Sequence, residues 1–285
     1  MKELLVISGK GGTGKTTVLG SFAVLSESKV LADADVDAPN LHLLLAPQMR
    51  SEEEYIGAAF AVMNAESCTG CGLCEQSCRF GAISDLEINP RRCEGCGVCA
   101  VVCPAGAIAM REEPTGRIFV SDTRYGPLIH ARLNPAAEAS GKLVTQVRER
   151  ARRLAGDAGA ELILTDGSPG IGCPVIASLA GVDYALVVTE PTPPGRHDME
   201  RVLQVAAHFG VPAGLCVNKW DLNPQLAEEI EQVGEAADAL PLARIPFDDA
   251  VAESTVEGVP LVEHASDGLA RAAIVDLWQA VARSL

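Results

Sequence analysis

A glycine-rich segment at residues 9–16 constrains the possible folds of this chain more than any other feature. It follows a short apolar run, 3–7, and leads into 15–26, which has the pattern of a helix. In this context the pattern G-x-x-x-x-G-K-[ST] binds phosphate, because its glycines let backbone N–H groups surround the oxygen atoms. The sequence therefore predicts a nucleotide site in which Lys15 reaches the terminal phosphates and Thr16 binds Mg²⁺. The residues expected to contact the nucleotide are Gly11, Gly12, Thr13, Gly14, Lys15, Thr16 and Thr17.

Strand-like and helix-like segments alternate along most of the chain. The predicted strands are 3–7, 30–32, 162–165, 184–189, 213–217 and 242–245, and the predicted helices are 15–26, 140–155, 197–208, 224–233 and 269–282. Such alternation predicts an α/β fold with a doubly wound, mostly parallel sheet. Hydrophobic residues make up 48% of the chain and aromatic residues only 4%, so the core should be aliphatic, as parallel strands buried between helices require.

Eight of the ten cysteines fall into two runs with the spacing C-x2-C-x2-C-x3-C. The second run repeats the first at an offset of 25 residues, the spacing between Cys68 and Cys93. In each run three sulfurs can reach three corners of a [4Fe–4S] cubane, while the fourth cysteine ligates the other cluster. We predict one cluster on Cys68, Cys71, Cys74 and Cys103 and a second on Cys93, Cys96, Cys99 and Cys78.

The cysteine runs lie in a segment that interrupts the nucleotide-binding domain. Composition shifts near residue 61 and strand-like patterning resumes at 117, so we predict a nucleotide-binding domain of 1–60 and 117–285 around an inserted, bacterial-ferredoxin-like α+β domain of 61–116. Zinc is the alternative metal, but a tetrahedral zinc site would use two or four cysteines and does not need the third cysteine of each C-x2-C-x2-C segment. Since about 50 residues make too small a core to fold unaided, clusters would also supply folding energy. Arg79 follows the last cysteine of the first run, whereas Pro104 follows the last cysteine of the second run.

The loop sequence K-G-G-T-G-K-T, with Lys10 inside it, resembles the deviant phosphate loop of the MinD/ParA/Mrp and nitrogenase iron-protein class of ATPases. The resemblance extends over nearly the whole chain, as a MinD-superfamily ATPase with an inserted ferredoxin domain. It implies Mg²⁺-dependent ATP hydrolysis by a homodimer that forms on ATP binding. In that dimer Lys10 would reach the partner's phosphates, although a solvated loop lysine is the alternative.

Two acidic segments resemble the switches of these ATPases. The run DADVDAPNL at 33–41 is similar to the first switch, which implies that Asp35 positions the attacking water and Asp33 belongs to the Mg²⁺ shell. Asp166, before Gly-Ser-Pro-Gly, resembles the Walker B aspartate and second switch D-x-P-P-G, with Ser168 in place of the first proline. Asp166 would hold Mg²⁺ through water, and the Gly170 N–H would contact the γ-phosphate. The catalytic residues implied are Lys10, Lys15, Asp35 and Asp166.

The identity of the base is less constrained by the sequence. Asn218, Lys219 and Asp221 match N-K-x-D, the guanine reader of many GTPases, but adenine-binding members of the resembled class also use an asparagine here. Lys10 favours ATP, while Asp221 leaves GTP open. We expect the base to contact Asn218, Lys219, Pro246 and Phe247.

Charge and hydropathy bear on location and partners. The net charge of −15 argues against a nucleic-acid surface. No apolar run approaches the ~20 residues that a membrane helix needs, and no signal-peptide pattern is present, so we expect a cytoplasmic protein without a membrane anchor. Cys216, within a strand, should be core. Cys173 is either a small buried residue at a helix start, the reading we favour, or a functional thiol.

These features lead to three hypotheses. In the first, nucleotide state gates electron transfer from the two clusters to a partner metalloprotein. In the second, the chain is an assembly or carrier ATPase, similar to Mrp, that hands a cluster to an apo iron–sulfur protein. In the third, it is a positioning ATPase similar to MinD or ParA, with the clusters as a redox sensor.

Overall fold

The computed structural model describes residues 1–135, 137, 141–264 and 267–285. The chain divides into two compact units: Met1–Glu53 together with Ile118–Leu285, and Glu54–Arg117. The sequence led us to expect an insertion at 61–116. The second unit begins earlier because strand β3 (Gln48–Met63) starts well before the cysteine-rich segment.

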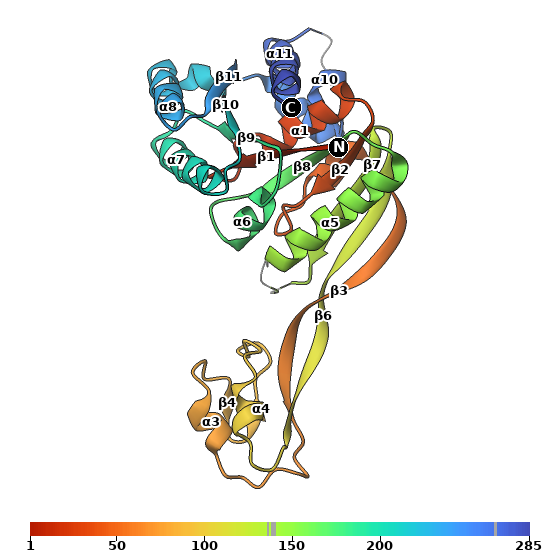
Figure 1. The fold of residues 1–285 in the computed structure, drawn as a ribbon, viewed down its shortest axis with the longest axis vertical. Coiled ribbons are helices and arrows are strands. Elements are labelled where there is room, and N and C mark those ends of the chain that lie inside the picture. Colours follow the sequence, from red (N-terminus) through yellow and green to blue (C-terminus); the bar gives the residue numbers. More distant parts are fainter. Residues whose placement is uncertain (136, 138–140, 265–266) are drawn as a thin grey trace. The chain divides into compact units, whose positions relative to one another are not determined.

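In the described residues the first unit is built on a sheet of nine strands in the order β11-β10-β9-β1-β8-β2-β7-β6-β3 (Figure 1). The pairings from β11 across to β7 are all parallel. Besides β3, the strands are β1 (Lys2–Ser8), β2 (Lys29–Asp33), β6 (Ile108–Thr123), β7 (Gly126–Leu133), β8 (Leu162–Pro169), β9 (Tyr184–Thr189), β10 (Ala213–Asn218) and β11 (Leu240–Ile245).

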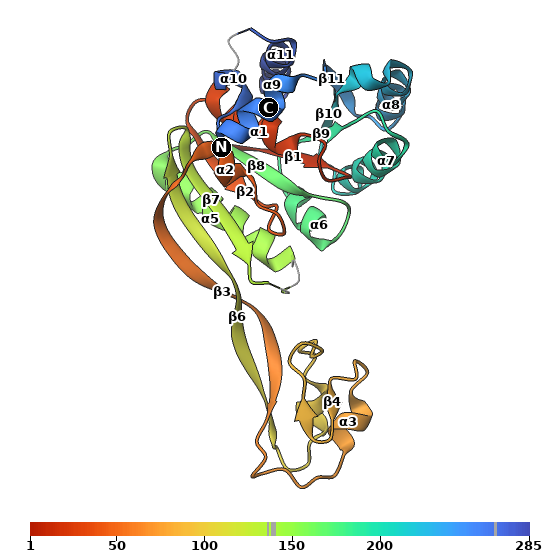
Figure 2. The same cartoon turned by 180° about the vertical axis from the view of Figure 1, so that it is seen from behind.

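Helices cover both faces of this sheet, as Figure 1 and its reverse view in Figure 2 show. Strand β1 illustrates why, since Leu4 and Val6 belong to one hydrophobic core, whereas Leu5 and Ile7 belong to another. The first core includes α1 (Lys15–Leu25), α2 (Leu41–Leu45), α10 (Leu261–His264) and α11 (Leu269–Ser284). The second includes α6 (Cys173–Leu179), α7 (Pro193–His208) and α8 (Pro224–Ala236), while α5 (Gly141–Ala158) packs against α6.

The predicted α/β fold with its mostly parallel sheet is confirmed, and each predicted strand lies within an observed one. The helix predicted at 140–155 is described from Gly141, because residue 140 lies outside the described residues. The sequence did not predict β7, α2, α9 (Asp249–Glu257) or α10. Among the described residues, no helix combines the length and apolar character needed to cross a bilayer.

The second unit has a small core in which cysteines take part. Its short elements are α3 (Leu73–Ser77), β4 (Ile83–Ser84), β5 (Glu87–Ile88) and α4 (Val98–Val102), with β4 and β5 antiparallel. Cys74 and Cys99 are buried together with Ala61, Ile83 and Ile108. Apolar side chains and thiols therefore share the interior of this unit.

Candidate nucleotide site and cysteine centres

The loop between β1 and α1 depends on glycine at specific positions. Gly12 and Gly14 have φ of 79° and 97°, a left-handed conformation that side chains with a Cβ rarely adopt. A Cβ on Gly14 would lie 2.3 Å from Nδ2 of Asn218, and one on Gly9 would lie 2.4 Å from the backbone of Asp198. The loop is thus closely packed on one side. Gly11 has open space around it.

Thr16 and Asp166 meet beside this loop, as the predicted Mg²⁺ site requires. The Thr16 hydroxyl donates a hydrogen bond of 2.7 Å to Oδ2 of Asp166. The other carboxylate oxygen, Oδ1, is buried and accepts no hydrogen bond from the described residues. Burial raises the pKa of Asp166 to about 6. A buried carboxylate oxygen without a partner fits a cation or its bound water, so these residues fit Mg²⁺.

The two first-switch aspartates differ in their surroundings. Asp33 is fully buried, and its two oxygens accept the N–H groups of Asp35 and Leu41, each at 3.1 Å. Burial and the neighbouring carboxylates of Asp166 and Asp35 raise the pKa of Asp33 well above its usual value. By contrast, Oδ1 of Asp35 is buried and accepts no hydrogen bond in the described structure. Asp33 therefore shapes the loop in this structure, and its place in the Mg²⁺ shell stays a prediction.

The two switch segments are hydrogen-bonded to each other and to the phosphate loop. The Ala34 N–H donates to the Asp166 carbonyl, and the Ser168 hydroxyl donates back to the Ala34 carbonyl, both at 2.8 Å. The Gly170 N–H donates to the Ser8 carbonyl at 3.0 Å. Gly170 would have to break this bond before it could contact a γ-phosphate.

Lys10 is held within its own chain. Its Nζ forms a 2.8 Å ion pair with Oε1 of Glu190, and this hydrogen bond raises the pKa of Lys10. Nζ of Lys219 lies 3.4 Å from the other oxygen of Glu190 and 3.5 Å from the Gly12 carbonyl. Glu190 was not among the site residues expected from the sequence. Glu190 directly follows β9, at the carboxyl edge of the sheet where ligand-contacting groups gather. This position could have identified it as a site residue.

The predicted base-contacting residues are linked by hydrogen bonds of their own. The Asn218 side-chain amide donates to the Thr13 carbonyl at 2.8 Å, so it supports the phosphate loop. The Phe247 N–H donates to Oδ1 of Asp221 at 2.7 Å, which joins the N-K-x-D segment to Pro246 and Phe247. Phe247 is 51% exposed, and an open aromatic face of this kind is available to a base.

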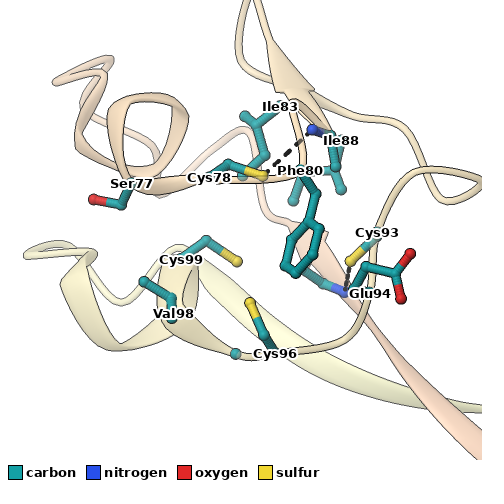
Figure 3. Close-up of a pocket in the computed structure, with 13 residues that line it drawn as sticks. Ser77, Cys78, Phe80, Ile83, Ile88, Cys93, Glu94, Cys96, Val98 and Cys99 are labelled. Atoms are coloured by element: carbon teal, nitrogen blue, oxygen red, sulfur yellow. Dashed lines mark hydrogen bonds between the residues drawn. The ribbon is translucent and has the colours of Figure 1, made fainter.

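Two cavities in the second unit are each lined by four cysteines. In each, three cysteines come from one run and the fourth comes from the other. The first cavity is lined by Cys68, Cys71, Cys74 and Cys103, and the second, drawn in Figure 3, by Cys78, Cys93, Cys96 and Cys99.

Backbone N–H groups point at several of these sulfurs. The N–H groups of Ala82 and Ala107 lie 3.3 Å from Sγ of Cys78 and Cys103, their respective partners. The N–H groups of Gly70 and Ala61 lie 3.5 Å from Sγ of Cys68 and Cys93. Over the described residues, no three or more His, Cys, Asp or Glu side chains are arranged to hold a single metal ion.

The two remaining cysteines lie in the first unit. Cys216 is fully buried in β10, as predicted. Cys173 is the first residue of α6 and is exposed, so our expectation that it is buried at a helix start was wrong. The cause is local, because the helix buries Val175 and Leu179 and turns its first residue outward.

The family described as "CobQ/CobB/MinD/ParA nucleotide binding domain" matches residues 4–261. An uncharacterised protein of Methanocaldococcus jannaschii is 37% identical over 224 residues, which cover 78% of this chain and 79% of that protein. A second uncharacterised protein of that organism is 26% identical over 236 residues, covering 78% and 83%.

Solved structures with a similar fold include the Pyrococcus furiosus cell division ATPase MinD, with a TM-score of 0.61, 19% identity and coverage of 99% and 98% of the two chains. The MinC:MinD complex of Aquifex aeolicus has a TM-score of 0.60 and 18% identity, with coverage of 99% of this chain and 96% of that chain. MinD of Pyrococcus horikoshii, complexed with Mg-ADP, has a TM-score of 0.57 and 18% identity, with coverage of 98% of this chain and 95% of that chain. With the family match spanning most of its length, this chain belongs to the CobQ/CobB/MinD/ParA nucleotide-binding family of P-loop proteins.

Proposed function

We propose that the chain binds and hydrolyses ATP with Mg²⁺. The main support is that Thr16 and Asp166 meet beside the phosphate loop. The Oδ1 atom of Asp166 is buried there and has no hydrogen-bond partner among the described residues. In this arrangement Thr16 and Asp166 would hold Mg²⁺, directly or through water, and the bound ion would supply positive charge beside the phosphate oxygens. Lys15, which is 6% exposed, binds the terminal phosphates.

The second unpaired carboxylate oxygen belongs to Asp35, and it suits the attacking water. Burial raises the pKa of Asp35, so the carboxylate is a stronger proton acceptor than an ordinary aspartate. We infer that Asp35 orients the water and takes its proton as the water oxygen bonds to the γ-phosphorus, while the bond from the γ-phosphorus to the bridging oxygen breaks and ADP leaves. ATP is favoured over GTP because Asp221, the residue that would read guanine, accepts the Phe247 N–H instead.

Homodimer formation on ATP binding is the next part of the proposal. Lys10 must leave Glu190 to reach a partner's phosphates, and its side chain is 43% exposed, so the lysine is not enclosed by the protein. The exposed Lys10–Glu190 pair contributes little on its own, and bound nucleotide can displace it.

We propose further that the second unit is a ferredoxin-like module with two [4Fe–4S] clusters. The supporting observation is that each cavity combines three thiols of one run with the fourth thiol of the other. Sulfurs around a single Zn²⁺ would lie about 3.8 Å apart, given Zn–S bonds near 2.3 Å and tetrahedral geometry. The described residues hold no such tight group. Backbone N–H groups beside the sulfurs suit thiolates bound to iron.

With both parts present, we propose that nucleotide state gates electron transfer from the clusters to a partner metalloprotein. The inserted unit lies in the sequence between Asp35 and Asp166, the two switch carboxylates. We infer that movement of the switches on ATP binding is transmitted along the chain to the two ends of the insertion.

The test is anaerobic reconstitution with iron and sulfide, followed by cluster potentials and electron-transfer rates with ATP, with ADP and without nucleotide. Different values among the three states are expected. Identical values in all three would refute gating, while a protein that binds no iron would refute the clusters themselves. Asp35→Ala, with slowed hydrolysis, should capture the ATP-bound partner complex in a pull-down.

Two rival functions each have one favouring observation. The likeness to MinD and ParA structures favours a positioning ATPase with the clusters as a redox sensor. The exposed thiol of Cys173, shortly after the second switch, favours a carrier that hands a cluster to an apo-protein. Cluster transfer to an apo-acceptor that is lost in Cys173→Ser would support the carrier. ATP-dependent assembly without electron transfer would support the positioning ATPase.

A further inference from the structure

The two halves of the inserted unit differ in charge, and their repeat makes the comparison direct. At the offset of 25 residues that relates Cys68 to Cys93, Arg91 and Arg92 correspond to Glu66 and Ser67. By the same offset, Arg79 corresponds to Pro104 and Glu75 to Ala100. The halves therefore share their cysteine spacing while their charges have diverged.

All three arginines are adjacent in sequence to cysteines of the second cavity. Arg79 follows Cys78, and Arg91 and Arg92 immediately precede Cys93. The residues next to the first cavity's cysteines include two acids instead, since Glu66 lies two positions before Cys68 and Glu75 follows Cys74. Positive charge is thus concentrated around one of the two cysteine centres.

The surface at the second cavity also has an apolar centre. Phe80 and Val98 line the cavity and are 41% and 42% exposed, and the guanidinium of Arg79 lies 5.8 Å from the centroid of the Phe80 ring. Figure 3 shows the Phe80 ring beside Cys78, Cys93 and Cys96. At the corresponding position of the first cavity the repeat has Ala105. Cys96, which lines the second cavity, is itself exposed.

The charges on this surface are available to a partner. Arg79, Arg91 and Arg92 are exposed, and none forms an ion pair with another described residue. Glu94, also exposed, is an acidic residue that lines the cavity itself. Aromatic and arginine side chains around an apolar centre are typical of protein interfaces, and complementary charge steers the encounter.

We propose that this surface docks the acidic face of an electron-transfer protein, and that electrons leave through the cluster held by Cys78, Cys93, Cys96 and Cys99. The inference rests on the proposed clusters. One electron passes from the reduced cluster to the acceptor, so the cluster is oxidised and the acceptor reduced by one electron, and no bond forms or breaks.

The net charge of the chain gives this proposal a sharp test. A protein of charge −15 repels anions overall, so its oxidation by an anionic reagent should speed up as salt screens the repulsion. A local positive surface at the exit cluster predicts the reverse, faster oxidation at low salt. The probe is the anionic cobalt(III)–EDTA complex, with cationic hexaamminecobalt(III) as its counterpart, mixed anaerobically with the reduced, cluster-loaded full chain in a stopped-flow instrument.

We expect the rate with cobalt(III)–EDTA to fall with added salt and to drop about tenfold at low salt in R91E/R92E. The control R153E/R201E makes the same change in net charge at exposed arginines of the first unit and should keep the wild-type salt dependence. R79E, next to Cys78 in the sequence, should shift the rate in the same direction as R91E/R92E. It serves as the second variant if R91E/R92E does not retain its clusters.

Several results would overturn the docking surface. One is a wild-type rate that rises with salt, and another is a double variant that behaves like its control. A change of oligomeric state in R91E/R92E would mean that a second copy covers this surface, which also contradicts the proposal. These outcomes can be read only from protein that contains iron and shows cluster absorbance. If the protein shows neither iron nor cluster absorbance, the proposed function is refuted, and the inference with it.

Discussion

Gly14→Ala tests whether the phosphate loop depends on the contact between Gly14 and Asn218. Gly14 has φ of 97°, where an alanine is strained, and the new Cβ would lie 2.3 Å from Nδ2 of Asn218. The Asn218 side chain must then move, which breaks its hydrogen bond to the Thr13 carbonyl.

The expected loss of stability has two parts, the backbone strain at residue 14 and the lost hydrogen bond of Asn218. Backbone strain of this kind costs about 1–3 kcal/mol, and losing one intramolecular hydrogen bond costs about 0.5–1.5 kcal/mol. We therefore expect Gly14→Ala to lower the free energy of unfolding by about 2–4 kcal/mol. Gly11→Ala is the matched control in the same loop, because nothing lies within 4 Å of its new Cβ, and it should change stability by less than about 0.5 kcal/mol.

The assay is urea unfolding followed by tryptophan fluorescence. Both tryptophans, Trp220 and Trp278, lie in the first unit, so their signal follows the unit that contains the loop. Repeating Gly14→Ala in an Asn218→Ala background separates the two terms, because the clash is gone and only the strain of about 1–3 kcal/mol remains. Equal stability of the Gly14→Ala and Gly11→Ala proteins would refute the reasoning. An undiminished effect in the Asn218→Ala background would refute the role of the side-chain contact.

Three further predictions concern the two centres. Thr16→Ala should weaken Mg-ADP binding roughly tenfold to a hundredfold, since a hydroxyl next to the ion is lost; calorimetry should find no difference between the two proteins when EDTA removes Mg²⁺. Burial raises the pKa of Asp166 to about 6, above its unfolded value near 3.9, so the contribution of Asp166 to wild-type stability falls as pH rises from about 4 to about 6. Asp166→Asn removes this loss and should be more stable than wild type at pH 7 but not at pH 4, as urea unfolding at the two pH values will show; a constant difference would contradict the assigned pKa. Cys103→Ser should disturb the cluster of Cys68, Cys71 and Cys74, and Cys78→Ser the other cluster. Electron paramagnetic resonance of each reduced variant should show a different cluster altered, and identical spectra would contradict the crossed ligand sets.

Residues close together in the sequence carried most of the correct predictions. The phosphate loop, the strand before it and the helix after it form one local unit, so composition and spacing were enough to place them. The same holds for the strands at 162–165, 184–189 and 213–217, whose apolar residues are largely buried between the helices on both faces of a parallel sheet. The strand at 242–245 lies at the edge of the sheet and is only partly buried. Long strands such as β3 were missed because their exposed, charged beginning, with Glu52, Glu53 and Glu54, lacks that apolar signature.

Contacts between distant segments were beyond sequence reasoning. Glu190 binds Lys10 across 180 positions, and Ser168 binds the Ala34 carbonyl across 134. The second case shows why, since the sequence presented Ser168 only as a departure from a proline. Only the fold reveals that its hydroxyl ties the two switches together. The sequence likewise could not show that the two oxygens of Asp33 accept the backbone N–H groups of Asp35 and Leu41, and its place in the Mg²⁺ shell stays a prediction.

The sequence by itself determined that a phosphate loop precedes a helix, that strands and helices alternate, and that eight cysteines form two equivalent runs. These properties depend on local spacing and on the burial pattern of each segment. The tertiary structure decided which strand ends meet at the nucleotide site and which carboxylate oxygens remain unpaired there. Hydrogen bonds of this kind depend on chain segments that only folding brings together, and no local pattern encodes their partners.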